Sequence, residues 1–362
     1  MIVTASYEAK AMGVKLGMRL RDARKLCPSL VGIESDPAKY RYVYHKLMAI
    51  MSEYSSHFRM KSIDEGVIDF ALTTGAMQQR DLVDIGHEIK QRLRNEIGCA
   101  MRCNVGIGTN RFLAKMAASL HKPDGLDVIT HQNLREVLGS LELQDLTGVA
   151  VRNEHRLNAV GIYTPLQMLD ATPEVLRLAF GGVVGEWWHQ RLRGWEVDKR
   201  DFPMRTIGRQ YVLERFDLNH DQVLQRLHNL CESVGFKLRS QGKQARGVFV
   251  YAKSKSKGYW RARHMASVPF SSNQAIYSLA AWLFQESPSD PKEIGITCYG
   301  LVDEGSVQLY LWGDELAREV HTTEVIDKIN ARYGDRTIHS VHTLGTGMYV
   351  KQKIPFGSTR YL

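Results

Sequence analysis

The acidic run Ser62-Ile63-Asp64-Glu65 is the segment of this chain whose residue types could do chemistry. Its two carboxylates interrupt an apolar stretch that continues to Phe70 and is typical of a β-strand. A carboxylate in apolar surroundings is costly unless it meets a cation or a hydrogen-bond donor. Carboxylate oxygens suit Mg²⁺, an ion that proteins also use to bind phosphates. The sequence therefore predicts a magnesium site at Asp64 and Glu65.

Strand geometry limits how this acidic pair can act. Neighbouring side chains of a regular strand point to opposite faces of the sheet. Asp64 and Glu65 can therefore reach one ion only at a bulge or at the end of a strand. Asp69, in the same run, is expected only to cap a turn.

Helices and strands alternate around the acidic run, which predicts an α+β protein with a mixed sheet covered by helices. Apolar spacing and capping residues predict helices over 7–12, 19–26, 37–54, 82–97 and 111–120, and a strand over 102–107. A separate α+β domain is expected after a polar linker. Its strands are predicted over 206–214, 247–252, 259–267 and 293–301, and its helices over 221–239 and 272–284.

Composition excludes several classes of protein. The 362 residues are 44% hydrophobic and 24% charged, which is typical of a soluble protein with two or three domains. Neither a signal peptide nor an apolar run of membrane-spanning length is found, so we expect a cytoplasmic protein that does not enter a membrane. The five cysteines form no Cys-x-x-Cys pair and the histidines form no His-Glu-x-x-His motif, which argues against a zinc enzyme.

Positive charge is concentrated in one segment. The net charge is +9, and nine basic residues without any acidic one lie between Lys237 and His264. Aromatic residues alternate with them, a pattern typical of binding to a nucleic-acid backbone. A solvated basic face or a patch for anionic membranes is the alternative. The candidate DNA-binding residues are Arg246, Lys253, Lys255, Lys257, Arg261 and Arg263.

Residues 146–162 have the outline of a helix-hairpin-helix, whose turn could hold a DNA phosphate through backbone N–H groups. Gly148 is the candidate contact. The usual second glycine of such a hairpin is Ala150 here, and a plain helical connector is the other interpretation.

The acidic run, three other segments and the hairpin occur in an order that resembles the Y-family translesion DNA polymerases of bacteria over essentially the whole chain. These segments are Ala5-Ser-Tyr-Glu-Ala-Lys-Ala-Met-Gly13, Ser62-Ile-Asp-Glu65, Val105-Gly-Ile-Gly-Thr-Asn-Arg-Phe-Leu-Ala-Lys-Met-Ala117 and His121-Lys-Pro-Asp-Gly125. The resemblance implies a right-hand polymerase with an additional little-finger domain. The implied parts are fingers 1–36, palm 37–140, thumb 141–195, linker 196–205, little finger 206–302 and a C-terminal tail 303–362.

The resemblance also implies roles for single residues. Asp64 and Glu65 match the palm carboxylates that bind two Mg²⁺ ions in the complete site. Tyr7, Lys10 and Lys122 match residues that contact the incoming deoxynucleoside triphosphate. Lys10 stands where the family more often has arginine, so a two-pronged phosphate contact would become a single point charge. Lys115 is expected near the DNA or the nucleotide, or else is a surface charge of its helix.

A partner motif is implied near the C-terminus. The pentapeptide Gln308-Leu309-Tyr310-Leu311-Trp312 resembles the segment by which bacterial polymerases dock on the sliding clamp, with Gln308, Leu309, Leu311 and Trp312 as anchors. An edge strand is the alternative, since its apolar residues alternate with polar ones, and Trp312 replaces the usual phenylalanine.

The family pattern begins with a palm strand carrying Asp-x-Asp-x-Phe-Phe, and the present residues start downstream of it. Three hypotheses follow. The first is an error-prone translesion polymerase, monomeric and acting on primer–template DNA, of which these residues are a fragment. The second is a catalytically inactive homologue that binds DNA and the clamp. The third is an unrelated basic nucleic-acid binder.

Overall fold

The described residues form two compact units, the first comprising residues 1–199 and the second residues from 203 to 346. The computed structural model describes residues 1–199, 203–215, 217–254, 256, 258–304, 314–334 and 336–346, with the backbone alone for 314–320. Lys255, Lys257 and the pentapeptide 308–312 therefore lie outside the described residues. No helix in the described ranges combines the length and the apolar character that crossing a membrane requires.

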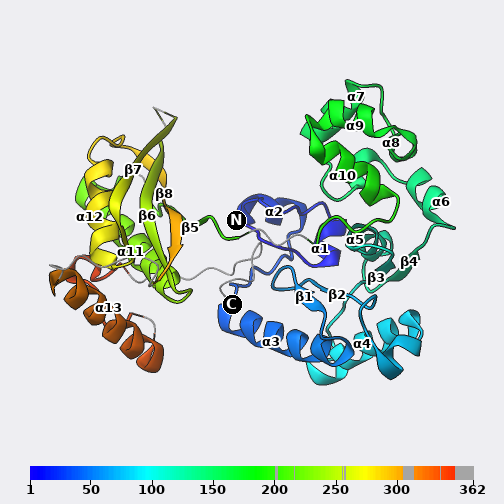
Figure 1. The fold of residues 1–362 in the computed structure, drawn as a ribbon, viewed down its shortest axis with the longest axis horizontal. Coiled ribbons are helices and arrows are strands. Elements are labelled where there is room, and N and C mark those ends of the chain that lie inside the picture. Colours follow the sequence, from blue (N-terminus) through cyan, green and yellow to red (C-terminus); the bar gives the residue numbers. More distant parts are fainter. Residues whose placement is uncertain are drawn as a thin grey trace. The chain divides into compact units, whose positions relative to one another are not determined.

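The first unit combines two small sheets with a series of helices (Figure 1). Its helices are α1 (Tyr7–Ala11), α2 (Leu20–Leu26), α3 (Pro37–Tyr54), η1 (Gly75–Gln79), α4 (Leu82–Glu96), α5 (Arg111–Leu120), α6 (Leu134–Gly139), η2 (Leu143–Asp145), α7 (Val151–Asn158), α8 (Pro165–Asp170), α9 (Pro173–Phe180) and α10 (Val183–Leu192). Its strands are β1 (Phe58–Met60), β2 (Gly66–Ile68), β3 (Val105–Gly108) and β4 (Leu126–Ile129).

Helices α3 and α4 begin at aspartate caps. The Asp36 carboxylate accepts the N–H groups of Ala38 and Lys39 at 3.0 and 3.3 Å, and Pro37 occupies the first helical turn. Asp81 caps α4 in the same way. The two helices share a small core that includes Ile50 and Ile85. These local signals explain why the predicted bounds of α3 are confirmed.

A tight antiparallel hairpin joins β1 to β2, with Met60 paired to Gly66. The prediction of one strand containing the acidic pair is wrong, because Asp64 and Glu65 lie in the turn between the two strands. The Glu65 carbonyl closes this turn by accepting the N–H groups of Lys61 and Ser62 at 2.7 and 3.1 Å. The expected mixed sheet is also wrong, since β1–β2 and β3–β4 are separate two-stranded sheets.

Strands β3 and β4 are parallel, and α5 connects them. The helix packs very close to β3, because a Cβ atom on Gly106 would lie 1.9 Å from the carbonyl oxygen of Ala114. Only glycine permits such an approach of helix to strand. The buried side chains of α5, among them Phe112 and Met116, share a core with the helices from α6 to α10.

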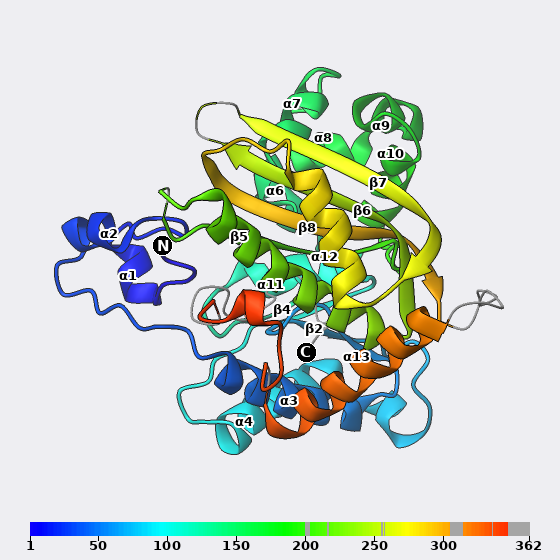
Figure 2. The same ribbon diagram turned by 90° about the vertical axis from the view of Figure 1, so that its left-hand side faces the viewer.

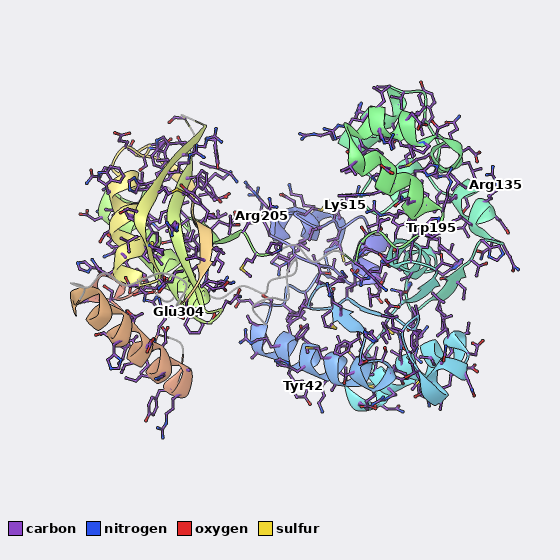
Figure 3. All side chains as sticks on the ribbon, viewed as in Figure 1. Lys15, Tyr42, Arg135, Trp195, Arg205 and Glu304 are labelled. Atoms are coloured by element: carbon purple, nitrogen blue, oxygen red, sulfur yellow. The ribbon has the colours of Figure 1, made fainter. Side chains whose placement is uncertain are left out.

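The chain after α10 lies against α5. Asn110 donates through Nδ2 to the carbonyl oxygens of Arg191 and Trp195 at 2.8 and 2.9 Å, and Trp195 is labelled in Figure 3. Further along, Lys199 forms an ion pair with Asp69 at 2.6 Å. The first residues of the predicted linker are thus bound to the first unit by specific contacts.

Asp69 offers a test of this attachment. Its hydrogen bond with Lys199 holds the pKa of Asp69 below its usual value. The pair therefore stabilises the fold above pH 4, and this stabilisation is lost as the pH falls through the lowered pKa. We expect Asp69→Asn to reduce the free energy of unfolding by about 0.5–1 kcal/mol at pH 7, because the pair is partly exposed, and by less near pH 3.

Urea unfolding at the two pH values measures this difference. Asparagine keeps an acceptor for the Ala71 N–H, to which Asp69 Oδ1 lies at 3.1 Å, so the turn cap expected at Asp69 survives the substitution. Lys199→Gln is the matched variant. A cost of Asp69→Asn that is equal at pH 7 and pH 3 would contradict the role of the ion pair.

The second unit is an antiparallel sheet with helices on one face. Its strands are β5 (Thr206–Val212), β6 (Lys243–Ser254), β7 (Tyr259–Phe270) and β8 (Pro291–Asp303), in the order β5-β8-β6-β7. Helices α11 (His220–Arg239) and α12 (Asn273–Phe284) lie side by side across one face (Figure 2). Between helices and sheet lies a core that includes Leu227, Val250 and Phe284.

The C-terminal part of this unit contains α13 (Asp314–Tyr333) and η3 (Val341–Thr343). Buried Arg239, on α11, binds Asp327 of α13 through Nε at 2.6 Å. Arg239 belongs to the basic segment 237–264 but not to the candidate DNA-binding residues, and its charge is paired inside the fold. Helix α13 was missed in the tail, although the apolar spacing from Val320 to Ile329 and the following Gly334 are helix signals.

Candidate active site

The turn between β1 and β2 presents its two carboxylates in different environments. Asp64 is exposed, and its Oδ1 accepts a hydrogen bond from the Ser62 hydroxyl at 2.5 Å. Glu65 is half-buried and binds an ammonium group, since Lys115 Nζ lies 2.6 and 2.5 Å from its two carboxylate oxygens. The structure thus joins two residues that lie 50 positions apart in the sequence.

A second cationic group lies at the base of the same turn. Partial burial lowers the pKa of Lys61, and the positive charges of Arg111 and Arg59 lower it further. Arg111 in turn has Glu196 nearby, with 3.6 Å between Nε and the carboxylate. The turn therefore carries two carboxylates, with Lys61 next to it in the chain and Lys115 bound to Glu65, an arrangement suited to a ligand with phosphate groups.

The carboxylate oxygens at this turn are suitable ligands for one magnesium ion. Mg²⁺ in phosphate-handling sites is bound by one or two carboxylates and completes its shell with water and phosphate oxygens. Asp64 and Glu65 supply such carboxylates, and exposure of Asp64 leaves a path for the ion. Among the described residues, no group of three or more His, Cys, Asp or Glu side chains could hold a metal.

Tyr7 and Lys10 both lie on α1, and their side chains are in contact. Ser6 caps this helix by accepting the Ala9 N–H at 3.3 Å, which begins the helix at Tyr7. Lys10 Nζ lies 4.8 Å from the centre of the Tyr7 ring, and both side chains are exposed. Within the described residues, neither Tyr7 nor Lys10 forms a hydrogen bond or ion pair with Asp64 or Glu65.

Lys122 is exposed in the loop between α5 and β4. Its neighbours hold this loop in place: His121 Nδ1 lies 2.6 Å from Asp127 Oδ1, and Asp124 forms an ion pair with Arg94. Within the described chain, Lys122 forms no ion pair, so its charge is available to a ligand.

Gly148 lies in a turn that connects η2 to α7. Its φ of 101° belongs to the region that favours glycine, and its carbonyl accepts a hydrogen bond from Asn153 at 2.9 Å. Ala150, which replaces the second glycine of the hairpin pattern, has φ −101° and ψ 175°. This is extended backbone that alanine adopts without strain.

The open face of the second sheet is the face opposite α11 and α12. Alternation with the buried residues Val248, Val250 and Ala252 directs Phe249, Tyr251 and Lys253 to this face. Tyr251 pairs with Arg261, and Phe249 pairs with Arg263, so aromatic and basic side chains lie in adjacent rows.

The charges on this open face are not equivalent. Lys253 is bound by Glu293 at 2.8 Å, whereas Arg261 and Arg263 are exposed and form no ion pair within the described residues. Arg246, also exposed, lies at a bulge of β6. The arginines of β7 thus supply the unneutralised charge of the face.

Two family models match the chain. The impB/mucB/samB family covers residues 1–119, and the impB/mucB/samB family C-terminal domain covers residues 205–311. The fold is similar to a solved "Y-family DNA polymerase chimera Dbh-Dpo4(243-245)-Dbh", with a TM-score of 0.68 and 19% identity over 83% of this chain and 88% of that one. An "Insertion ternary complex of Dbh DNA polymerase" matches with a TM-score of 0.53, 19% identity, and coverage of 82% and 86%. Fold and sequence together define the class of protein as a Y-family, DNA-directed DNA polymerase.

Relatives of similar sequence indicate which branch of the Y family the chain belongs to. A DNA polymerase IV of Pelotomaculum thermopropionicum is 32% identical over 93% of this chain and 84% of its own length. A DNA polymerase IV of Moorella thermoacetica is 32% identical over 96% of this chain and 88% of its own length. The chain belongs to the bacterial DNA polymerase IV branch of the Y family.

Proposed function

We propose that this protein extends a DNA primer along a damaged template, with Mg²⁺ held at the β1–β2 turn and with the low accuracy implied by the family resemblance. The observation that carries the proposal is the pair of adjacent carboxylates, Asp64 and Glu65, on an exposed turn in a chain of this family. Asp64 and Glu65 would hold Mg²⁺ there, and the ion would supply charge stabilisation for the primer 3′-hydroxyl and the phosphates; the complete site of the family would hold two such ions.

The chain's own residues would position the substrates. Tyr7 and Lys10, from α1, and Lys122, from the α5–β4 loop, are proposed to bind the triphosphate of the incoming nucleotide. Lys10 and Lys122 act as point charges and hold phosphate without the two-pronged geometry of arginine. Residues 1–36, 37–140 and 141–195 correspond in this proposal to fingers, palm and thumb, and Gly148 holds a DNA phosphate.

The open face of the second sheet is proposed to bind the DNA backbone, chiefly through Arg261 and Arg263. Four other residues are proposed to add to the positive electrostatic potential that attracts the DNA: Arg246, Lys253, Lys255 and Lys257. We expect the double variant Arg261→Gln/Arg263→Gln to bind duplex DNA roughly tenfold to fiftyfold more weakly at 0.1 M salt, with no dependence on sequence. The slope of log affinity against log salt should become shallower by about 1.8, since two phosphate contacts are lost.

Fluorescence anisotropy at several salt concentrations measures this effect. The charge-matched control is Arg215→Gln/Lys243→Gln, because these two residues are bound by Asp217 and Asp303. Equal affinity and equal salt slope for both double variants would contradict the assignment of the open face.

The segment Gln308, Leu309, Leu311 and Trp312 is proposed to bind the bacterial sliding clamp, which would keep a monomeric polymerase on its template. Because DNA is the proposed substrate, we also propose that the protein is cytoplasmic.

Primer extension with the purified chain tests the proposed function. A primer–template with one abasic site or an undamaged template, the four deoxynucleoside triphosphates and Mg²⁺ should give templated products that disappear when EDTA is added. Any templated, Mg²⁺-dependent incorporation would rule out the alternative, a catalytically inactive homologue that binds DNA and the clamp.

A further inference from the structure

The Glu65 carboxylate already has a cationic partner, because Lys115 Nζ contacts both of its oxygens. We propose that Lys115 competes with the metal ion for Glu65 and thereby sets the metal affinity of the site. This inference rests on the proposed function, in which Asp64 and Glu65 bind Mg²⁺. It makes Lys115 a positioning residue, since it acts through Glu65.

Both ends of this ion pair are attached to fixed backbone. Lys115 lies in the middle of α5, which packs closely on β3, because a Cβ atom on Gly106 or Gly108 would overlap the backbone of α5. The Glu65 backbone is held in the turn through its carbonyl, which accepts two N–H groups. Rotation of the two side chains is therefore sufficient to open the pair.

The exposure of the pair indicates that it can exchange partners. The side chains of Lys115 and Glu65 are 42% and 40% exposed, so water screens their attraction. A fully buried pair would be held far more strongly once formed. An ion pair of this exposure is stable enough to orient Glu65 and weak enough for a divalent cation to displace the ammonium.

The two carboxylates of the turn suggest an order of events. Among the described residues, the Asp64 carboxylate is bound by a neutral hydroxyl and by no cation, so an arriving Mg²⁺ meets no competing charge from them there. Glu65 must exchange its ammonium partner for the ion. The displaced Lys115 ammonium then lies beside the site, where a phosphate oxygen of the primer or the nucleotide is a suitable new partner.

Metal binding to the full chain without DNA tests this inference. Calorimetric titration with Mg²⁺, and with Mn²⁺ followed by electron paramagnetic resonance, gives the Kd. We expect Lys115→Gln to lower the Kd roughly threefold to tenfold, because a competing positive charge is removed. Lys46→Gln, which removes an exposed lysine of α3, is the matched control and should leave the Kd unchanged.

Lys115→Arg provides a second variant that keeps the charge. A guanidinium group holds a carboxylate with two hydrogen bonds, so the Kd should equal or exceed the wild-type value. A Kd that falls in Lys115→Arg, or that is unchanged or raised in folded Lys115→Gln, would overturn the inference. Thermal melting of each variant checks folding.

Glu65→Gln separates this inference from the proposed function. If Glu65→Gln abolishes or greatly weakens metal binding while Lys115→Gln behaves like the wild type, the competition is refuted and the metal site stands. If Glu65→Gln binds metal as tightly as the wild type, the ion does not bind at this turn, and both the metal site and the competition are refuted.

Discussion

Asp64→Asn is expected to lower the rate of Mg²⁺-dependent nucleotide incorporation by roughly 10²–10³, which corresponds to about 3–4 kcal/mol of transition-state stabilisation. The substitution removes one of the two negative charges that the turn offers to the metal. A neutral amide oxygen still contacts the ion, but it no longer offsets the positive charge of a divalent cation.

Single-turnover primer extension at several Mg²⁺ concentrations measures this loss. Asparagine keeps an oxygen that accepts the Ser62 hydroxyl, so the turn itself should persist and the melting temperature should change little. Glu34→Gln, in the exposed loop before α3, removes an equal charge away from the turn and is the control. Equal rates for Asp64→Asn and Glu34→Gln would exclude Asp64 as a metal ligand.

Gly106→Ala should cause the largest loss of stability among the substitutions considered for the first unit, about 3–4 kcal/mol in its free energy of unfolding. The added methyl group would lie 1.9 Å from the Ala114 carbonyl oxygen and 2.3 Å from the Ala118 amide nitrogen. Both atoms belong to the backbone of α5, so no side-chain rotation relieves the overlap. The helix must move away from β3, and the core beneath it loses packing.

Urea unfolding followed by circular dichroism measures this cost. Gly139→Ala is the matched control, because its methyl group would meet only Leu166 Cδ1 at an ordinary distance of 3.5 Å, and a change below about 0.5 kcal/mol is expected. Because the chain divides into two units, the transition of the second unit should stay at its wild-type midpoint. Similar urea unfolding midpoints of the first unit for Gly106→Ala and Gly139→Ala would contradict the close packing of α5 on β3.

Sequence patterns correctly predicted helices whose capping residues and apolar spacing lie within a single segment. Helices α3 and α5 have their predicted bounds, because the caps Asp36 and Asn110 and the apolar spacing are contained within each segment. The acidic pair shows where such signals fail. The apolar run 62–70 favours a strand, but the pairing of Met60 with Gly66 makes 61–65 a turn, and pairing is a contact between segments.

The sequence alone determined the residue types, their order and hence the resemblance to a polymerase family, because these properties do not depend on folding. It also located the two carboxylates and the excess of basic residues. Only the tertiary structure decided which charges remain available. Lys115 forms an ion pair with Glu65, 50 positions away in the sequence, and Arg239 forms one with Asp327. Arg261 and Arg263 form no ion pair within the described residues. Such pairings follow from how α5 packs on β3 and α13 on α11, and packing between distant segments leaves no local pattern in the sequence.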